Sequence, residues 1–344
     1  MRVLLTLLKI IGGIAILVAP AMLALYFLFD PHFPPLDQAA REDLSRTQTG
    51  SFTKLSDGVT YYQWHGDVQG EKIVLVHGFM IPSFVFISLT QSLVQEGYRV
   101  LTYDQFGRGF SDRPDTDYDA ELLDRQLTEL MDTLEITRTH LMGYSMGGAL
   151  ATIFAAHHPE RIQSLTLIAP VGLAGDGASQ IPLLTRLFLS PGIGDWAVQV
   201  LGPSFITKHA TSGFSKATDP ADMGKRFLMQ TRYDGYSEAL LSILRFYPLE
   251  GSAKPSFQEV GRLDIPVLLL WGEDDAQVPV TAAPAIQNAI PQSQLNTYSR
   301  YGHEIAYAGV HSYSPALLTF LAENTPQNTR EESSQQTPDS KEAP

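Results

Sequence analysis

The 344-residue chain has no cysteine and few basic residues. Without a thiol it can form no disulfide, no thiolate metal site and no cysteine nucleophile. Lysine and arginine number 24 against 37 acidic residues, which gives a net charge of −13. Phosphate contacts need clustered basic side chains, so the sequence predicts no nucleic-acid partner. No cluster of metal-ligating residues stands out either, and we expect neither a metal nor an organic cofactor.

Charge is also missing from the N-terminal segment. Residues 10–29 (IIGGIAILVAPAMLALYFLF) carry no charged side chain, and a helix of this length spans roughly 30 Å, the thickness of a bilayer's hydrocarbon core. Arg2 and Lys9 precede this run, and mostly acidic residues follow it. Residues 1–29 therefore predict a single-pass membrane anchor, with the rest of the chain in a periplasmic or extracellular space. A signal peptide cleaved near Ala19–Ala21 and a cytosolic orientation are the alternatives.

The remaining sequence divides by composition and periodicity. Short apolar strands alternate with amphipathic helices, which is typical of a mainly parallel sheet with helices on both faces. The alternation stops over residues 174–260, where helical patterns replace strands. Ligands bind at the carboxyl ends of parallel strands, so we expect this insertion to form a helical cap over the site. The other segments are a linker (30–48), two parts of the core (49–173 and 261–322) and a disordered tail (323–344).

One motif in the core carries chemistry. Residues 143–147 read Gly-Tyr-Ser-Met-Gly, after a predicted strand and before a predicted helix. This is the context of a nucleophile elbow, where glycines two before and two after the serine let strand and helix approach closely. A plain glycine turn is the structural alternative. We predict that Ser145 is a nucleophile.

A serine hydroxyl needs a base, and the base needs a carboxylate to orient it. His303 follows a late predicted strand in a Gly-His turn, so it is the expected base. Glu273, Asp274 and Asp275 follow a buried strand, and spacing alone does not choose among them. Other histidines are less favoured for catalysis: His157, His158, His209 and His311.

Backbone N–H groups are expected to stabilise the developing oxyanion. Met146 follows the nucleophile and supplies one donor. The loop after the strand KIVLVHG supplies the other, from Phe79. His77 precedes this loop, and we expect it to brace the loop rather than to take part in catalysis.

Five motifs together resemble the α/β-hydrolase superfamily over roughly residues 50 to 322. They are HGF (77–79), DQFGRGFSDRP (104–114), GYSMGG (143–148), WGEDDAQVP (271–279) and GH (302–303). The resemblance implies an α/β-hydrolase fold with an eight-stranded, mainly parallel sheet. It places the triad acid at Asp275, with Asp274 as runner-up, and gives Asp104 and Arg108 a structural role. The sequence departs from the family where an acidic residue often follows the histidine by five positions; here Glu304 is adjacent instead.

The resemblance implies a serine hydrolase that cleaves carboxylic esters through an acyl-enzyme. The apolar N-terminus and cap favour a lipophilic substrate such as a lipid ester, and the serine at the elbow argues against relatives that use aspartate there. C–C bond hydrolysis of diketone-like acids, or cofactor-free perhydrolysis, would use the same triad. A carboxylate substrate would favour a cap arginine, and four are available: Arg186, Arg226, Arg232 and Arg245. A non-catalytic binding protein on this scaffold is the third alternative.

Overall fold

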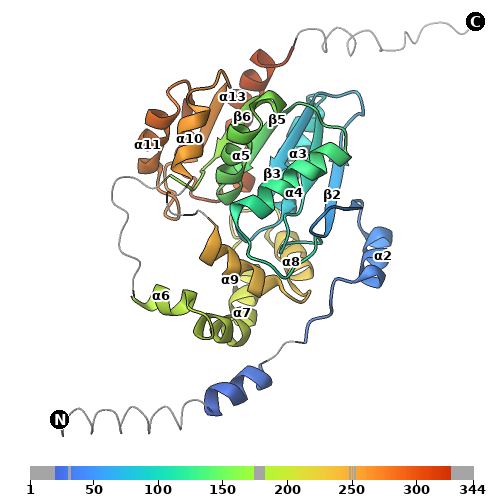
Figure 1. Cartoon of the computed structure of the whole chain (residues 1–344). Helices are drawn as coiled ribbons and strands as arrows, with labels where there is room; N and C mark the ends of the chain where they lie inside the picture. Colours follow the sequence, from blue (N-terminus) through green and yellow to red (C-terminus); the bar gives the residue numbers. More distant parts are fainter. Residues whose placement is uncertain are drawn as a thin grey trace, which may run out of the picture.

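The computed structural model describes residues 20–29, 32–173, 183–247, 249, 251 and 253–326 (Figure 1). Most of the predicted tail, from residue 327 onward, lies outside the described residues, as do residues 1–19 of the predicted anchor. Within the described part, no helix is long and apolar enough to cross a bilayer. Residues 20–28 are helical, and Trp196 Nε1 of the cap donates a hydrogen bond to Met22 O at 2.8 Å.

Eight strands form one sheet in the order β1-β2-β4-β3-β5-β6-β7-β8. They are β1 (Ser51–Lys54), β2 (Val59–His65), β3 (Lys72–Val76), β4 (Arg99–Tyr103), β5 (Thr139–Tyr144), β6 (Ile162–Ile168), β7 (Val267–Gly272) and β8 (Gln294–Tyr298). β1 and β2 pair antiparallel, as do β2 and β4, and all other pairs are parallel. The predicted eight-stranded, mainly parallel sheet is confirmed.

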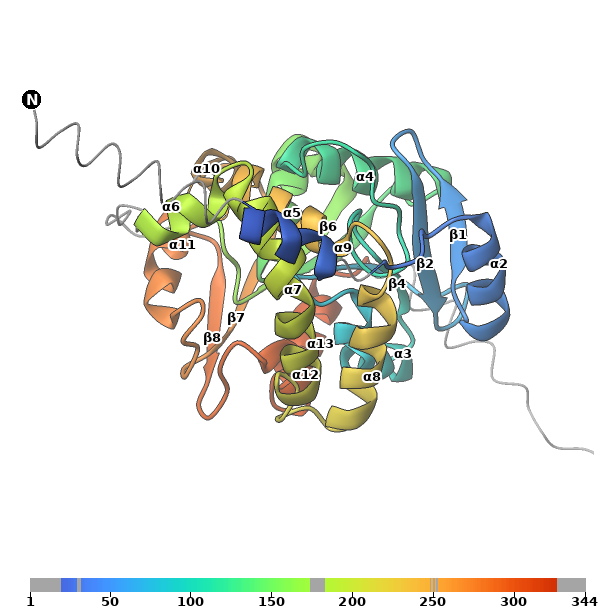
Figure 2. The same cartoon turned by 90° about the horizontal axis from the view of Figure 1, so that it is seen from below.

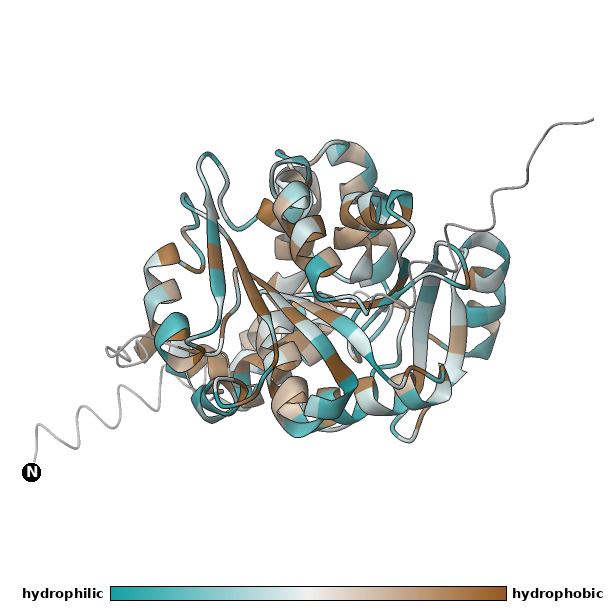
Figure 3. Cartoon of the chain, turned by 90° about the horizontal axis from the view of Figure 1, so that it is seen from above, coloured by the Kyte–Doolittle hydropathy of each residue, from teal (hydrophilic) through white to brown (hydrophobic). Residues whose placement is uncertain are grey.

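Helices cover both faces of this sheet, as predicted. Side chains of α4 (Ala120–Thr133), α5 (Met146–His157), α10 (Lys254–Val260) and α11 (Ala283–Ala289) form a core on one face. α3 (Ile87–Gln95), α12 (Ile305–Ala308) and α13 (Val310–Glu323) cover the other face. Figure 2 shows the two helical layers, and Figure 3 shows apolar strands between them. The central strands β5, β6 and β7 are wholly buried, which explains why they read as continuous apolar runs.

The described residues between β6 and β7 include helices and no strand. The helices are α6 (Leu183–Leu189), α7 (Ile193–Ser212), α8 (Pro220–Thr231), α9 (Tyr236–Phe246) and α10. Residues of α7, α8 and α9 lie over the end of the sheet at which the parallel strands terminate (Figure 1). The predicted cap range, 174–260, extends too far at its end, because Phe257 and Val260 of α10 are fully buried in the core beside α5.

The predicted linker, residues 30–48, contains a packed helix. α2 (Gln38–Thr47) begins at Asp37, whose side chain accepts a hydrogen bond from Ala40 N at 2.9 Å. Leu44 is buried against Tyr61 and Phe110. An acidic N-cap and a single inward leucine are enough to order a short helix against a neighbouring sheet. The prolines before it made this stretch resemble a linker.

Candidate active site

The turn between β5 and α5 holds Ser145 in a conformation that non-glycine residues rarely adopt. Its backbone φ is 54° and its ψ is −119°. Such strain costs on the order of 1–3 kcal/mol and persists only where the surroundings fix it. Ser145 N donates to Ile168 O of β6 at 2.9 Å, and Gly148 N donates to Ser145 O at 2.9 Å. The hydroxyl is thereby presented at the carboxyl end of the sheet, beneath the cap.

The glycines around Ser145 are required by close backbone contacts. A Cβ on Gly147 would lie 2.1 Å from Val76 O, and one on Gly143 would lie 2.2 Å from Gly147 O. Atoms cannot approach this closely, so any other residue would push α5 away from β3 and β5. These two glycines therefore let a helix begin against two central strands.

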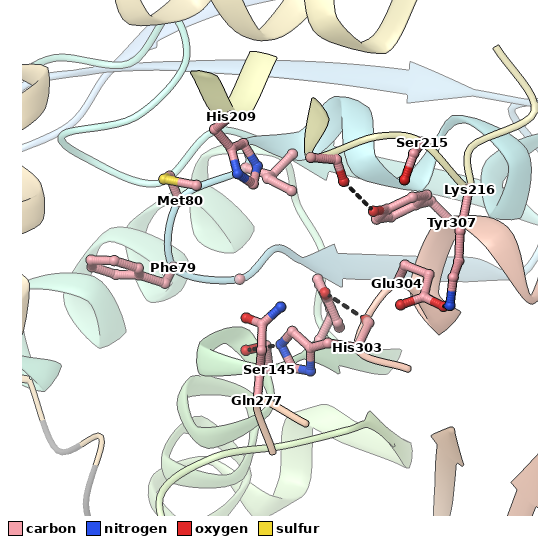
Figure 4. Close-up of a pocket in the computed structure, with 14 residues that line it drawn as sticks. Phe79, Met80, Ser145, His209, Ser215, Lys216, Gln277, His303, Glu304 and Tyr307 are labelled. Atoms are coloured by element: carbon pink, nitrogen blue, oxygen red, sulfur yellow. Dashed lines mark hydrogen bonds and ion pairs between the residues drawn. The ribbon is translucent and has the colours of Figure 1, made fainter. Parts of the chain in front are cut away.

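Three side chains predicted from distant parts of the sequence meet at this turn: Ser145, Asp275 and His303. Figure 4 shows two of them, Ser145 and His303. His303 Nδ1 lies 2.7 Å from Asp275 Oδ2, and His303 Nε2 lies 2.9 Å from Ser145 Oγ. With the Nδ1–H donated to the carboxylate, Nε2 is free to accept the serine proton. This arrangement has the geometry of a nucleophile, a base and an orienting acid.

The structure also chooses among the three acidic residues after β7. The Asp275 side chain is fully buried, whereas Glu273 and Asp274 are exposed. Besides His303, Asp275 accepts hydrogen bonds from Gln277 N at 2.9 Å and Val278 N at 2.8 Å. Three donors hold the carboxylate in one orientation. The resemblance placed the acid at this position, whereas spacing alone left three options.

The histidine is held by its neighbours on both sides. The Tyr144 hydroxyl donates to His303 O at 2.8 Å, and the two rings lie 5.1 Å apart. Glu304 Oε1 accepts from Gly302 N at 2.9 Å and from Lys216 Nζ at 2.6 Å. Burial alone would raise the pKa of Glu304, but these hydrogen bonds outweigh it and lower the pKa below its ordinary value. The loop is therefore braced without an acidic residue five positions after the histidine.

The two predicted oxyanion donors flank the serine. Met146 is the first residue of α5, so its N–H has no acceptor within the helix. Phe79 follows Gly78, where a Cβ would lie 3.3 Å from Ser145 Cβ. The loop after β3 thus passes directly beside the nucleophile. Both N–H groups belong to segments that meet at Ser145, as an oxyanion hole requires.

His77 lies at the start of this loop and does not line the cavity that contains Ser145. Its Nε2 accepts a hydrogen bond from Gln105 N at 2.9 Å, and its Nδ1 lies 2.8 Å from Gly78 O. Complete burial, with the nearby Arg108 charge, holds the pKa of His77 well below its ordinary value. A neutral imidazole with hydrogen bonds at both ring nitrogens fits the structural role expected for His77.

The loop after β4 is organised by the buried Asp104. Its carboxylate accepts from Ser83 N at 3.0 Å, from Ser83 Oγ at 2.6 Å and from Phe110 N at 2.9 Å. Arg108, which is also fully buried, donates to Gln105 Oε1 at 2.6 Å. Burial lowers the pKa of Arg108 to about 10. Neither side chain lines the site, so both shape the loop, as the resemblance implied.

Two adjoining cavities lie between the cap and the strand ends. The first, of about 230 Å³, is the more polar of the two, and we call it the polar cavity; it includes Ser145 and His303. The second, of about 570 Å³, is largely apolar and lies between α7, α9 and the loop after β3. The two cavities share four lining residues: Phe79, Met80, His209 and Gln277. An apolar cavity thus adjoins the cavity that contains the nucleophile.

Sequence reasoning missed two residues of the polar cavity and misplaced others. Lys216 and Gln277 both line it. Lys216 lies outside every motif, and Gln277 lies within WGEDDAQVP (271–279), where only the three acidic residues were considered. Among the described residues that line the two cavities, Lys216 is the only lysine or arginine. None of the four cap arginines lines either cavity; Arg245, for example, pairs with Asp195 at 2.9 Å. The described residues contain no group of three or more potential metal ligands.

A comparison with protein families matches residues 72–309 to the alpha/beta hydrolase fold. The match covers the elbow, the acid and the histidine described above. The chain belongs to the α/β-hydrolase family. The predicted family is therefore confirmed, with all three triad positions inside the matched range.

Two curated relatives are similar over most of their length. The 2-hydroxy-6-oxononadienedioate/2-hydroxy-6-oxononatrienedioate hydrolase of Comamonas testosteroni is 27% identical over 81% of this chain and 99% of its own. The 2-hydroxy-6-oxo-6-phenylhexa-2,4-dienoate hydrolase of Burkholderia cepacia is 28% identical over 81% of this chain and 99% of its own. Among solved structures, a bromoperoxidase from Bacillus anthracis has a TM-score of 0.66 and 20% identity, covering 79% of this chain and 99% of its own. That likeness concerns the fold.

Proposed function

We propose that the chain is a serine hydrolase that attacks a substrate carbonyl with Ser145. His303 Nε2 takes the hydroxyl proton as Oγ adds to the carbonyl carbon, and Asp275 holds the imidazolium that forms. The N–H groups of Phe79 and Met146 receive the negative oxygen. Collapse breaks the bond to the leaving group, which takes the proton from His303, and water then releases the acyl group. The hydrogen-bonded chain Ser145–His303–Asp275 carries this proposal.

C–C bond hydrolysis of a keto acid is the first candidate reaction. The curated relatives named above hydrolyse 2-hydroxy-6-oxo acids, and hydrolysis at such a ketone breaks a C–C bond. These names favour this reaction over the ester hydrolysis that the sequence led us to expect. Lys216 lines the same cavity as the nucleophile and is the basic group that a substrate carboxylate could reach there.

Ester hydrolysis is the second candidate, and a different observation favours it. The cavity that adjoins the one containing Ser145 is lined mainly by apolar side chains, with no lysine or arginine among its described lining residues. Lys216 is already paired with Glu304. A neutral, lipophilic acyl ester would bury its apolar part there without desolvating a charge.

The test is turnover by the purified chain and by Ser145→Ala on both substrate classes. One panel holds 2-hydroxy-6-oxo dienoic acids and the other holds short- and long-chain acyl esters. We expect the variant to lose roughly four orders of magnitude or more of kcat on the preferred class. Undiminished turnover would refute the triad. A fluorophosphonate that failed to label Ser145 would favour the non-catalytic binding protein instead, because only an activated serine reacts.

We propose separately that the uncharged run of residues 10–29 attaches the chain to a membrane, with the hydrolase domain outside the cytoplasm. Its length and lack of charge support this, as does the basic bias before it. Extraction of isolated membranes with alkaline carbonate provides the test. An anchored chain stays in the pellet, and a chain that appears in the supernatant contradicts the anchor.

A further inference from the structure

A set of large apolar side chains lies exposed at the cap end of the molecule. We call this set the apolar face. Its members come from residues 20–29, α6 and α7: Leu23, Phe27, Leu28, Phe29, Leu183, Leu184, Leu187, Ile193, Leu201 and Phe205. Leu184 is 80% exposed and Leu28 is 76% exposed. Apolar side chains gathered in this way on a soluble protein mark a surface that contacts something else.

The three segments form one surface rather than scattered patches. The hydrogen bond from Trp196 Nε1 to Met22 O joins helix 20–28 to the first turn of α7. Figures 1 and 2 both show this helix beside α7, with α6 at the same end of the molecule. On α7, Ile193, Leu201 and Phe205 are spaced by multiples of four, so they follow one stripe of the helix.

This face also forms the rim of the apolar cavity. Leu201 and Phe205 line the cavity and are at the same time 58% and 59% exposed. Phe188, at the end of α6, lines it as well. The cavity therefore opens among the same side chains that make up the face, and its inner end reaches Phe79 beside Ser145.

The chain itself points to the occupant of the face. Helix 20–28 is the end of the 20-residue uncharged run that starts at Ile10, so a segment suited to a bilayer leads directly into this surface. A net charge of −13 disfavours an acidic protein partner and anionic lipid alike. A zwitterionic bilayer surface carries no net charge and does not repel the chain. Apolar side chains partition into the boundary between its headgroups and acyl chains.

We propose that the apolar face docks on a lipid bilayer, so that the cavity beneath α6 and α7 takes up an apolar substrate from the lipid. Docking does not depend on the reaction catalysed. The uptake of substrate rests on the proposed hydrolase function. It extends that function by setting the source of the substrate and the side from which it enters.

Docking can be tested with the full-length protein in phosphatidylcholine vesicles. Because the chain has no cysteine, a single introduced cysteine carries a fluorophore without competing labels. Leu184→Cys and Ile193→Cys place it on the face. Val68→Cys is the matched control, because Val68 is 61% exposed. Val68 follows β2, which runs antiparallel to β4, so it lies at the end of the strands opposite the cap.

Brominated phosphatidylcholine quenches fluorophores that enter the acyl region. We expect quenching several-fold greater at the two cap positions than at Val68. Equal quenching at all three, or none at any, overturns docking, even for a chain that stays anchored by residues 10–29. A change in fluorescence at the cap positions that depends on protein concentration and not on lipid also overturns docking. Such a change would indicate that the apolar face contacts a second copy of this chain.

Substrate uptake is tested with a second pair of full-length variants, Leu184→Glu and Val68→Glu. A short-chain nitrophenyl ester is supplied in solution and a long-chain one within vesicles. We expect Leu184→Glu to lose several-fold in rate on the vesicle ester only, and Val68→Glu to lose nothing. Equal loss on both esters overturns uptake from lipid. If neither the parent chain nor any variant turns over a carbonyl substrate, the proposed hydrolase function is wrong. The quenching result still decides whether the apolar face docks on a bilayer.

Discussion

Lys216 of the cap and Glu304 of the core form an ion pair across the polar cavity, with 2.6 Å between Nζ and Oε1. Glu304 is adjacent to His303 and also accepts a hydrogen bond from Gly302 N. The pair thus joins the cap to the loop that carries the base. Its lysine is 57% exposed, so the attraction is partly screened and contributes at most about 1 kcal/mol to stability.

Replacing Lys216 distinguishes the two candidate reactions. A substrate carboxylate that takes this lysine from Glu304 gains a charge-assisted hydrogen bond worth about 1.5–3 kcal/mol. For a keto acid, we therefore expect Lys216→Met to raise KM by roughly 10- to 100-fold, with a smaller effect on kcat. For a neutral ester, KM should change little.

Steady-state kinetics on both substrate classes provides the measurement for Lys216→Met. Lys225→Met is the control, since Lys225 is an exposed lysine on α8 away from the polar cavity. A large rise in KM with Lys225→Met as well would show a general effect of lost positive charge rather than a contact with the substrate.

Asp275 and Asp274 are adjacent, yet the structure gives them different roles. Asp275→Asn cannot accept the Nδ1–H of His303 as a carboxylate does, so the imidazolium loses its stabilising charge. We expect kcat to fall by roughly 10³- to 10⁴-fold, as in serine hydrolases with this triad. Asp274 is exposed, and Asp274→Asn should leave kcat within about two-fold, as expected for an exposed site. Similar losses in both variants would place the acid elsewhere.

Gly147 and Gly202 both lie in helices but in different surroundings. Gly147→Ala would put a Cβ 2.1 Å from Val76 O, which must move α5 away from β3. Overpacking of this kind costs about 1–3 kcal/mol or more. A Cβ on Gly202 lies 3.2 Å from the movable Ser237 Oγ, and alanine favours helix by up to about 1 kcal/mol. Urea unfolding should show a clear loss for Gly147→Ala and little change, or a gain, for Gly202→Ala.

Local patterns were enough to predict the sheet and the elbow. Continuous apolar runs identify buried parallel strands, and the glycines flanking Ser145 report a contact that only glycine permits. The acid was different: Glu273, Asp274 and Asp275 have the same local pattern. Asp275 differs from the other two because the turn buries it and gives its carboxylate two backbone N–H donors. The local sequence does not show this difference, and the family motif was needed to choose Asp275.

Contacts between distant segments that lie outside the family motifs could not be predicted. Lys216 reaches Glu304 across 88 residues of sequence, and nothing near either residue signals the pairing. α10 has the same helical pattern as the cap helices, but Phe257 and Val260 pack beside α5 because of where the chain returns to the sheet. Likewise, α2 depends on a surface that includes Phe110, far along the chain from Leu44.

His140 on β5 makes the stability of the fold dependent on pH. The side chain is fully buried, with Nδ1 2.7 Å from Ser164 Oγ and Nε2 3.2 Å from Thr325 Oγ1. Burial, with a smaller effect of the Arg138 charge, lowers its pKa from 6.5 to about 4. Between these two values the unfolded chain binds a proton that the folded chain does not. The free energy of unfolding therefore rises with pH across this window.

The contribution of His140 is present in full above pH 6.5 and is lost as the pH falls towards about 4. Its size is on the order of 3 kcal/mol. Urea unfolding of His140→Gln at several pH values should show a shallower fall in stability below neutrality than the parent chain. Ser164→Ala removes a hydrogen-bond partner but keeps the imidazole buried, so it should lower stability and retain the steep pH dependence. An unchanged slope in His140→Gln would mean that this histidine takes up its proton without unfolding the sheet.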